Sequence, residues 1–230
     1  AVIGMWEPGR DLVLAGHSKD VPCNLVATAQ LDSVDVRPGT HEATHVYQLH
    51  LTVLTRSHDL LWGLYGANAV HFSYLLEYLA ARLDAEAVFR VTVGTLTFIS
   101  ANPHVYTAEW DKRWSRRLQD QGSCPDGPYE LGFARGGRPS LFSPAHGTVA
   151  DWEAELAAFL SPQWQLALHS QPFFPDVAQP MRATWAARHD LDPGVPMAIA
   201  QGIRAPDWRL AAVQWLGRRA EARRDKVGAP

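Results

Sequence analysis

The fold is decided by a stretch in which a strand, a long helix and a second strand follow one another. The strand is Tyr47-Gln48-Leu49-His50-Leu51-Thr52-Val53, where apolar and polar residues alternate with the period of a half-buried strand. Apolar residues on one helical face follow: Phe72, Leu75, Leu76, Leu79 and Leu83. Such a helix is predicted to be committed to burial. Residues 89–99, with Phe89, Val91, Val93 and Ile99, predict the next long strand.

Weaker signals extend this core in both directions. Residues 24–36 are a further strand candidate and Arg37-Pro38-Gly39-Thr40 is typical of a turn, so we expect a hairpin with the strand at 47–53. Residues 2–6 are predicted to form a strand with no lead-in, and we therefore expect that an N-terminal part precedes Ala1.

The rest of the chain is predicted to be helical and loop-rich. Helices are expected at residues 107–121, 148–160 and 206–224, with a Gly- and Pro-rich loop at 122–147. Thr148 or Asp151 is the start signal of the middle helix, and Pro206 suits the first turn of the last one. The last helix has a basic end, Arg218, Arg219, Arg223 and Arg224, which is better explained as a solvated helix terminus than as a binding patch.

Composition restricts the function classes. The chain is 47% hydrophobic and 20% charged with a net charge of −3, so a general nucleic-acid surface is not expected. No apolar run approaches the roughly 18 residues that a membrane span needs. The two cysteines, Cys23 and Cys124, do not make a disulfide framework. We expect a cytoplasmic protein, in whose reducing surroundings a lone cysteine can be chemical.

Reactive and polar residues gather where the predicted strands end. Cys23 lies just before one strand and Arg56 at the end of the next, so pairing of these strands would bring the guanidinium near the thiol and favour the thiolate. Ser57, Asp59, Asn68, His104 and Tyr106 also lie at strand ends or loop edges, where sites tend to form. Each residue alone has an ordinary explanation: a buried cysteine, a turn, or a helix cap at Asn68.

Their order and spacing are more specific. Pro22-Cys23, then Arg56-Ser57-His58-Asp59, Gly63, Asn68 and finally His104-Val105-Tyr106 resemble the thymidylate synthase / deoxypyrimidine hydroxymethylase superfamily, in a phage-type or specialised branch. The resemblance covers residues 2–110. It implies an α+β fold, thymidylate synthase-like, with a mainly antiparallel sheet flanked by helices. It also implies that residues 1–230 form a single catalytic domain lacking its N-terminal part, and that the protein is a homodimer assembled through the sheet.

The resemblance also implies a role for each matched residue. Cys23 would add to C6 of a pyrimidine nucleotide, and C5 would then attack the one-carbon unit of 5,10-methylenetetrahydrofolate. Arg56 and Ser57 would bind the phosphate, and Arg56 would favour the thiolate. Asn68 would read the base edge, since an amide offers a donor and an acceptor to uracil. His104 and Tyr106 would hold the sugar, and Asp59 and Gly63 would contact the pterin, with Trp62 lining the folate site.

Several positions depart from the family pattern. Asn24 follows Cys23 where the family often has His, and Thr55 stands where Gln usually precedes the Arg. Between Gly63 and Asn68 the chain has one residue more than the usual spacing. The family's catalytic Glu, its first phosphate-binding Arg and the Arg-Arg pair of the partner subunit are expected upstream of Ala1.

Functional hypotheses of three kinds remain open within these limits. Hydroxymethylation of dUMP is favoured, because the chain ends without the hydrophobic tail that helps synthases close their site for hydride transfer. Methylation of dUMP, as in thymidylate synthase, and hydroxymethylation of dCMP or CMP are alternatives. A non-catalytic nucleotide-binding relative is the third. No metal is expected, because the spacing of His41, His45 and His50 matches no zinc pattern.

Overall fold

The computed structural model describes residues 1–15, 21–34, 46–107, 140–190 and 192–227 of the chain. The chain divides into two compact units, Ala1–Gly122 and Ser123–Pro230. The predicted turn at 37–40, all but the first residue of the predicted helix at 107–121, His41, His45 and Cys124 lie outside the described residues. The single catalytic domain expected over residues 1–230 stays a prediction.

The first unit is built on a four-stranded sheet. Its strands are β1 (Val2–Gly4), β2 (Asn24–Val34), β3 (Val46–Thr55) and β5 (Arg90–Ser100), in the order β1-β2-β3-β5. The pairs β1-β2 and β2-β3 are antiparallel, as predicted, whereas β3 and β5 run parallel. A parallel neighbour requires a crossover, and the helix α2 (Asn68–Glu86) supplies it. The α+β class is thereby confirmed, with a sheet that is mixed.

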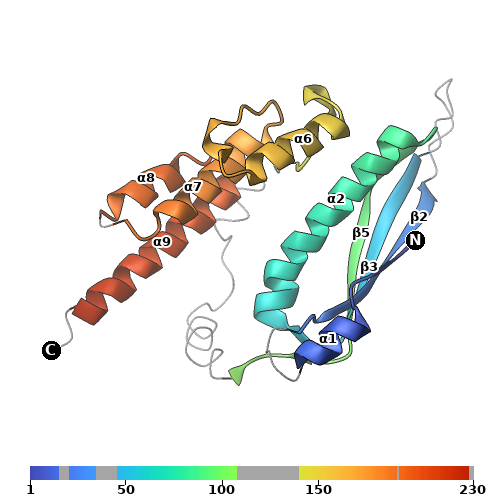
Figure 1. The fold of residues 1–230 in the computed structure, drawn as a ribbon, viewed down its shortest axis with the longest axis horizontal. Helices are drawn as coiled ribbons and strands as arrows, with labels where there is room; N and C mark the ends of the chain where they lie inside the picture. Colours follow the sequence, from blue (N-terminus) through green and yellow to red (C-terminus); the bar gives the residue numbers. More distant parts are fainter. Residues whose placement is uncertain (16–20, 35–45, 108–139, 191, 228–230) are drawn as a thin grey trace. The chain divides into compact units, whose positions relative to one another are not determined.

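The helix α2 lies along the sheet and closes the core of this unit (Figure 1). Alternate residues of β3, Leu49, Leu51 and Val53, are buried beneath it. Phe72 and Leu76 of α2 are buried against them, and the partly buried Leu75, Leu79 and Leu83 pack on the same cluster. The strand and helix periodicities of the sequence therefore predicted which faces meet.

His50 has a structural role on the other face of β3. The register of β3 and β5 shifts between Leu49 and Leu51, and the backbone N–H of Thr95 donates to His50 Nδ1 over 3.0 Å. A Cβ on Gly94 would lie 2.8 Å from two atoms of the His50 ring. Glycine at this bulge thus makes room for the imidazole, which satisfies a donor that the shifted register leaves unpaired.

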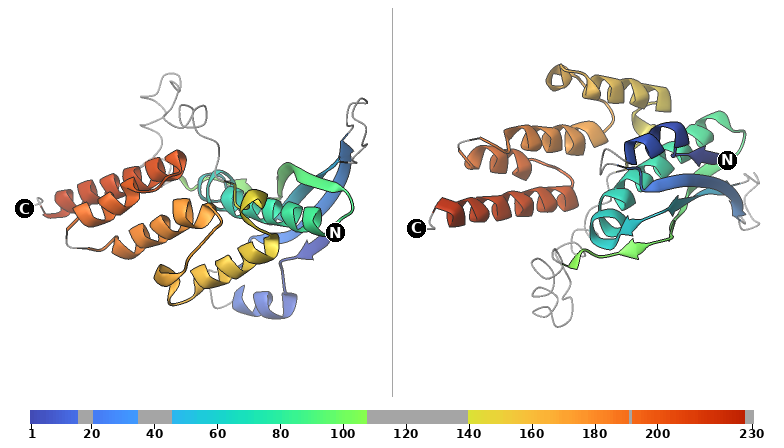
Figure 2. Two further views of the ribbon diagram at one scale, coloured as in Figure 1. Left: turned by 90° about the horizontal axis from the view of Figure 1, so that it is seen from above. Right: turned by 60° about the horizontal axis from the view of Figure 1, so that its bottom comes forward.

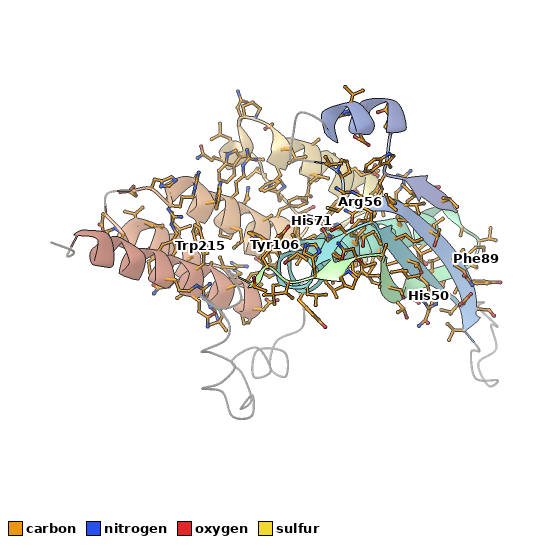
Figure 3. All side chains as sticks on the ribbon, turned by 90° about the horizontal axis from the view of Figure 1, so that it is seen from below. His50, Arg56, His71, Phe89, Tyr106 and Trp215 are labelled. Carbon is orange, nitrogen blue, oxygen red and sulfur yellow. The ribbon has the colours of Figure 1, made fainter. Side chains whose placement is uncertain are left out.

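Short elements follow the carboxyl ends of β3 and β5. The two-residue strands β4 (His58–Asp59) and β6 (Pro103–His104) pair in parallel, and the π-helix η1 (Leu60–Ala67) connects β4 to α2. The helix α1 (Pro8–Ala15), which the sequence did not predict, follows β1. Figure 3 shows Arg56 and Tyr106 toward one end of this unit and His50 and Phe89 toward the other.

The described part of the second unit is helical. Its longer helices are α6 (Val149–Leu160), α7 (Gln179–Ala187), α8 (Gly194–Gln201) and α9 (Pro206–Val227), with short turns η2 (Pro144–His146), η3 (Trp164–Leu166) and η4 (Phe174–Ala178). The last three long helices lie side by side (Figure 2). Their shared core is Val177, Ala200, Ile203, Ala205, Ala212 and Leu216. The predicted helices at 148–160 and 206–224 are confirmed; α7 and α8 were not predicted.

Two local devices shape the start of this unit. Thr148 and Asp151 form a capping box, in which Thr148 Oγ1 accepts from the Asp151 N–H and the Asp151 carboxylate accepts from the Thr148 N–H. Phe174 is fully buried beneath the rings of Trp152, Phe159, His169 and Phe173. In the described part of the chain, no helix is both long and apolar enough to cross a membrane.

Candidate active site

Cys23 and Arg56 are neighbours, as the sequence predicted. The backbone N–H of Arg56 donates to the Cys23 carbonyl over 2.9 Å. The guanidinium turns back onto the same loop, where Nε donates to the Pro22 carbonyl over 3.0 Å and Nη2 to the Val21 carbonyl over 3.2 Å. The Cys23 side chain is exposed and unbridged, and its Sγ lies 3.8 Å from the Val21 carbonyl. The pair therefore presents an accessible thiol beside a permanent cation.

Ser57, His104 and Tyr106 form a second group next to this pair. Ser57 Oγ lies 3.5 Å from His104 Nδ1, and that nitrogen lies 3.2 Å from the Asn102 carbonyl. The His104 and Tyr106 rings meet edge to face with centroids 5.0 Å apart. Tyr106 is 61% exposed, so its hydroxyl-bearing ring is open to a ligand. The pairing of β4 with β6 brings the two motifs together.

The residues expected to contact folate lie on and around η1. Asp59 caps this helix by accepting from the Trp62 N–H. Trp62 and Tyr65 are 76% and 80% exposed, which is unusual for two large rings on one short helix. Flat exposed rings beside a carboxylate suit a pterin, which offers an aromatic face and ring N–H donors. Tyr65 was not predicted; its position three residues after Trp62 was the available signal.

Asn68 begins α2, and the extra residue before it is absorbed by the π-helix. The Asn68 N–H donates to the Gly63 carbonyl, five residues back, which is the hydrogen bond that defines a π-turn. A π-turn holds one residue more than an α-helical turn. The insertion noted in the sequence therefore lies inside η1, and Asn68 still starts the long helix.

His58 is a buried residue at this site to which the sequence gave no role. It occupies the variable position of Arg56-Ser57-His58-Asp59, is 2% exposed, and accepts at Nε2 from Asn68 Nδ2 over 3.0 Å. A Cβ on Gly63 would lie 2.5 Å from His58 Cδ2, so the glycine leaves the space that the ring fills. The contact predicted between Gly63 and a pterin stays a prediction.

Burial disfavours the protonated form of His58. Burial lowers its pKa below the ordinary 6.5, Asp59 opposes the shift, and His104 adds to it. Nδ1 is buried without a hydrogen-bond partner among the described residues. The ring also packs on Phe98, with centroids 5.3 Å apart. A neutral imidazole in such surroundings can accept a hydrogen bond at Nε2, as the geometry requires.

These contacts place the predicted residues in small groups that follow one another along the chain after β3 and β5. No described group of three or more His, Cys, Asp or Glu side chains is arranged to hold a metal ion. Trp6 is a further neighbour that the sequence did not indicate, since the Arg56 guanidinium lies 5.9 Å from the centre of its ring.

Comparison with known proteins points in the same direction. The chain is 36% identical over 231 residues to the deoxyuridylate hydroxymethyltransferase of Pseudomonas phage M6, a match that covers 96% of this chain and 58% of that protein. It is 34% identical to the deoxyuridylate hydroxymethyltransferase of Bacillus phage SP01, over 44% of this chain and 22% of the relative. A protein of Methanosarcina barkeri, provisionally named thymidylate synthase, is 37% identical over 48% of this chain and 40% of its own length.

No family model matches the chain, and no solved structure matches it. The relatives nevertheless confirm the resemblance to the thymidylate synthase / deoxypyrimidine hydroxymethylase superfamily that the motifs predicted. The chain spans 58% of the length of the phage M6 relative.

Proposed function

We propose that the protein transfers a one-carbon unit from 5,10-methylenetetrahydrofolate to C5 of dUMP and forms 5-hydroxymethyl-dUMP. Cys23 would add to C6 and make C5 nucleophilic. The folate would supply the carbon, and water would complete the hydroxymethyl group. Methylation of dUMP is the alternative, in which a hydride from the folate completes a methyl group. Both relatives from phages are named deoxyuridylate hydroxymethyltransferase, and this favours the hydroxymethyl product.

The observation that carries the proposal is the contact of the Cys23 loop with Arg56. An exposed thiol on a loop that the Arg56 guanidinium holds in place suits conjugate addition, because the accessible soft sulfur can attack an electron-poor double bond. The same guanidinium, with Ser57, can bind a phosphate. The contacts of Arg56 with the Cys23 loop and of Ser57 with His104 argue against a relative that retains the residues only by descent.

The other ligand contacts are proposed on the neighbouring groups of residues. Asn68 would read the base, and His104 with Tyr106 would hold the sugar hydroxyl. The exposed rings of Trp62 and Tyr65 beside Asp59 fit a pterin. Each group therefore has a chemically suitable partner in the first unit of the chain.

A thymidylate synthase-like fold and a homodimer are proposed as well. The alternation of β5 leaves Thr95, Thr97 and Ile99 exposed on the face turned away from α2, and Ile99 is 54% exposed. A sheet face that carries exposed β-branched residues suits burial against a second copy. Sedimentation of the full-length protein would test this, and a monomer at micromolar concentration would contradict it.

Mass analysis of the product tests the proposed reaction. The full-length protein is incubated with dUMP or dCMP and methylenetetrahydrofolate, and the nucleotide is expected to gain the mass of a hydroxymethyl group with dUMP. A methyl product would select the alternative. If the protein binds dUMP and dCMP but changes neither nucleotide, it is a non-catalytic nucleotide-binding protein.

A further inference from the structure

His58 is the buried polar residue at the site to which the proposed reaction gives no role. Its ring is 2% exposed and is held by contacts on several sides. Its backbone N–H donates to the Asn102 carbonyl over 3.0 Å, its ring packs on Phe98, and Gly63 leaves the space it fills. Burial of an imidazole with one unpaired nitrogen costs free energy. A functional reason for keeping a histidine at this position is therefore expected.

The hydrogen bond between His58 and Asn68 supplies this reason. An Asn amide can rotate by 180°, which exchanges its oxygen and its nitrogen, and only its neighbours decide between the two orientations. Here Asn68 Nδ2 donates to His58 Nε2 over 3.0 Å. A neutral imidazole with the proton on Nδ1 offers only an acceptor at Nε2, so the opposite orientation would place the amide oxygen against a lone pair.

The orientation of this amide decides which base it can read. Uracil presents an acceptor at O4 and a donor at N3, whereas cytosine presents a donor at N4 and an acceptor at N3. An amide that matches one base in one orientation matches the other base after a 180° rotation. A freely rotating Asn would therefore discriminate poorly between the two nucleotides.

We propose that His58 is a positioning residue that locks the Asn68 amide in the orientation that reads uracil and so excludes dCMP. This inference rests on the proposed function, in which Asn68 reads the base. The π-helix contributes by placing Asn68 within reach of the ring despite the extra residue. Gly63 contributes by admitting the ring.

The test measures the affinities of the full-length protein for dUMP and dCMP by calorimetry in wild type and variants. His58→Leu keeps an apolar side chain against Phe98 and removes the acceptor, so the dUMP preference is expected to fall about tenfold, the scale of one hydrogen bond. The glutamine of His58→Gln can accept a hydrogen bond from Asn68 or donate one to it. The preference of this variant for dUMP should therefore lie between those of wild type and His58→Leu. Phe98→Leu alters the packing of the same ring without touching the amide and should keep the wild-type preference.

The outcomes separate the two proposals. If His58→Leu lowers the affinities for dUMP and dCMP equally, or leaves the ratio of the two affinities within twofold of wild type, His58 is only a packing residue and the inference is wrong. A wild type that prefers dCMP would also overturn it. If wild type binds dUMP selectively but forms no product, the proposed reaction fails while the affinity series still decides the role of His58. Binding of neither nucleotide would overturn both proposals.

Discussion

The two units of the chain hold their cores by different means. In the first unit, alternating residues of β3 and a helical stripe of α2 meet face to face, and the residues of the proposed site follow the ends of these strands. In the second, helices pack around aliphatic and aromatic residues such as Ala200, Ile203 and Phe174. A sheet with one covering helix brings sequence-distant loops to one edge, which is where sites form.

The second unit contains a group of polar residues that bond to one another. Glu155 accepts from the Ser170 and Gln171 backbones, and the fully buried Gln171 bridges the backbone of Ser143. Burial alone would raise the pKa of the Glu155 carboxyl, but these hydrogen bonds and the nearby His169 hold it below its ordinary value. These polar residues bond to one another, whereas Cys23, Trp62 and Tyr106 of the proposed site in the first unit are exposed. The residues of the proposed site therefore all lie in the first unit, whereas the polar cluster of the second unit is closed by its own hydrogen bonds.

Replacement of the nucleophile should have the largest effect. Cys23→Ser is expected to reduce turnover by roughly a thousandfold or more while dUMP still binds, because only the bond-forming atom is changed. Turnover and calorimetry on the full-length protein would measure this. Cys124→Ser is the control and should stay active. Near-normal turnover of the Cys23 variant, or an adduct of 5-fluoro-dUMP on Cys124, would show that Cys23 is not the nucleophile.

A cavity in the second unit should affect stability and leave the site intact. Phe174→Ala removes a fully buried ring and is expected to cost about 3–5 kcal/mol, measured by urea unfolding. Leu51→Ala in the first unit, at a site that is also fully buried, should cost about 2–5 kcal/mol. Folded Phe174→Ala protein should bind dUMP as wild type does. Lost dUMP affinity in that folded variant would show that the second unit contributes to the site.

Within the first unit, Arg56 is expected to bind the phosphate of the nucleotide. Arg56→Ala should weaken dUMP binding by roughly 1.5–3 kcal/mol, the scale of charge-assisted hydrogen bonds, and should spare deoxyuridine, which has no phosphate. Arg90→Ala is a matched control, because Arg90 begins β5 and pairs with Asp84. Equal losses for nucleotide and nucleoside would indicate that Arg56 only supports the Cys23 loop.

The capping box of α6 should matter less. Thr148→Ala removes the acceptor of the Asp151 N–H and is expected to destabilise the protein by about 1 kcal/mol. Thr148→Ser keeps the hydroxyl and should behave as wild type. Thermal unfolding of the two variants side by side gives the difference, and an equally destabilised Thr148→Ser would mean that the methyl group matters more than the cap.

The pH dependence of stability should differ slightly between His58 in the first unit and Glu155 in the second. The folded-state pKa of His58 lies below 6.5, so its contribution to stability is present above about pH 6.5 and is lost as the pH falls, when the unfolded chain takes up the proton first. The folded-state pKa of Glu155 lies below 4.5, so its contribution is lost only in stronger acid.

Unfolding of wild type, His58→Gln and Glu155→Gln from pH 7.5 to 4 would separate these contributions. His58→Gln should flatten the stability curve below pH 6.5, and Glu155→Gln should flatten it only toward the acid end. Curves that parallel wild type would show that neither group titrates differently in the folded state.

The sequence by itself determined much of this protein. The alternation at 47–53 and the helical stripe from Phe72 to Leu83 specified which faces are buried, because hydrophobic period reports local geometry directly. The order of Cys23, Arg56 and Asn68 predicted the resemblance to the superfamily that the relatives support. The Thr148 start signal was likewise readable, since a cap acts over three residues.

Only the tertiary structure decided the rest. The parallel pairing of β3 with β5 depends on where α2 returns the chain, and the role of His58 depends on Gly63 and Asn68 meeting around one ring. His58 occupies a variable position in its motif, so no residue pattern marked it. Long-range contacts of this kind are set by the packing of whole elements, whereas a local pattern can only specify the elements themselves.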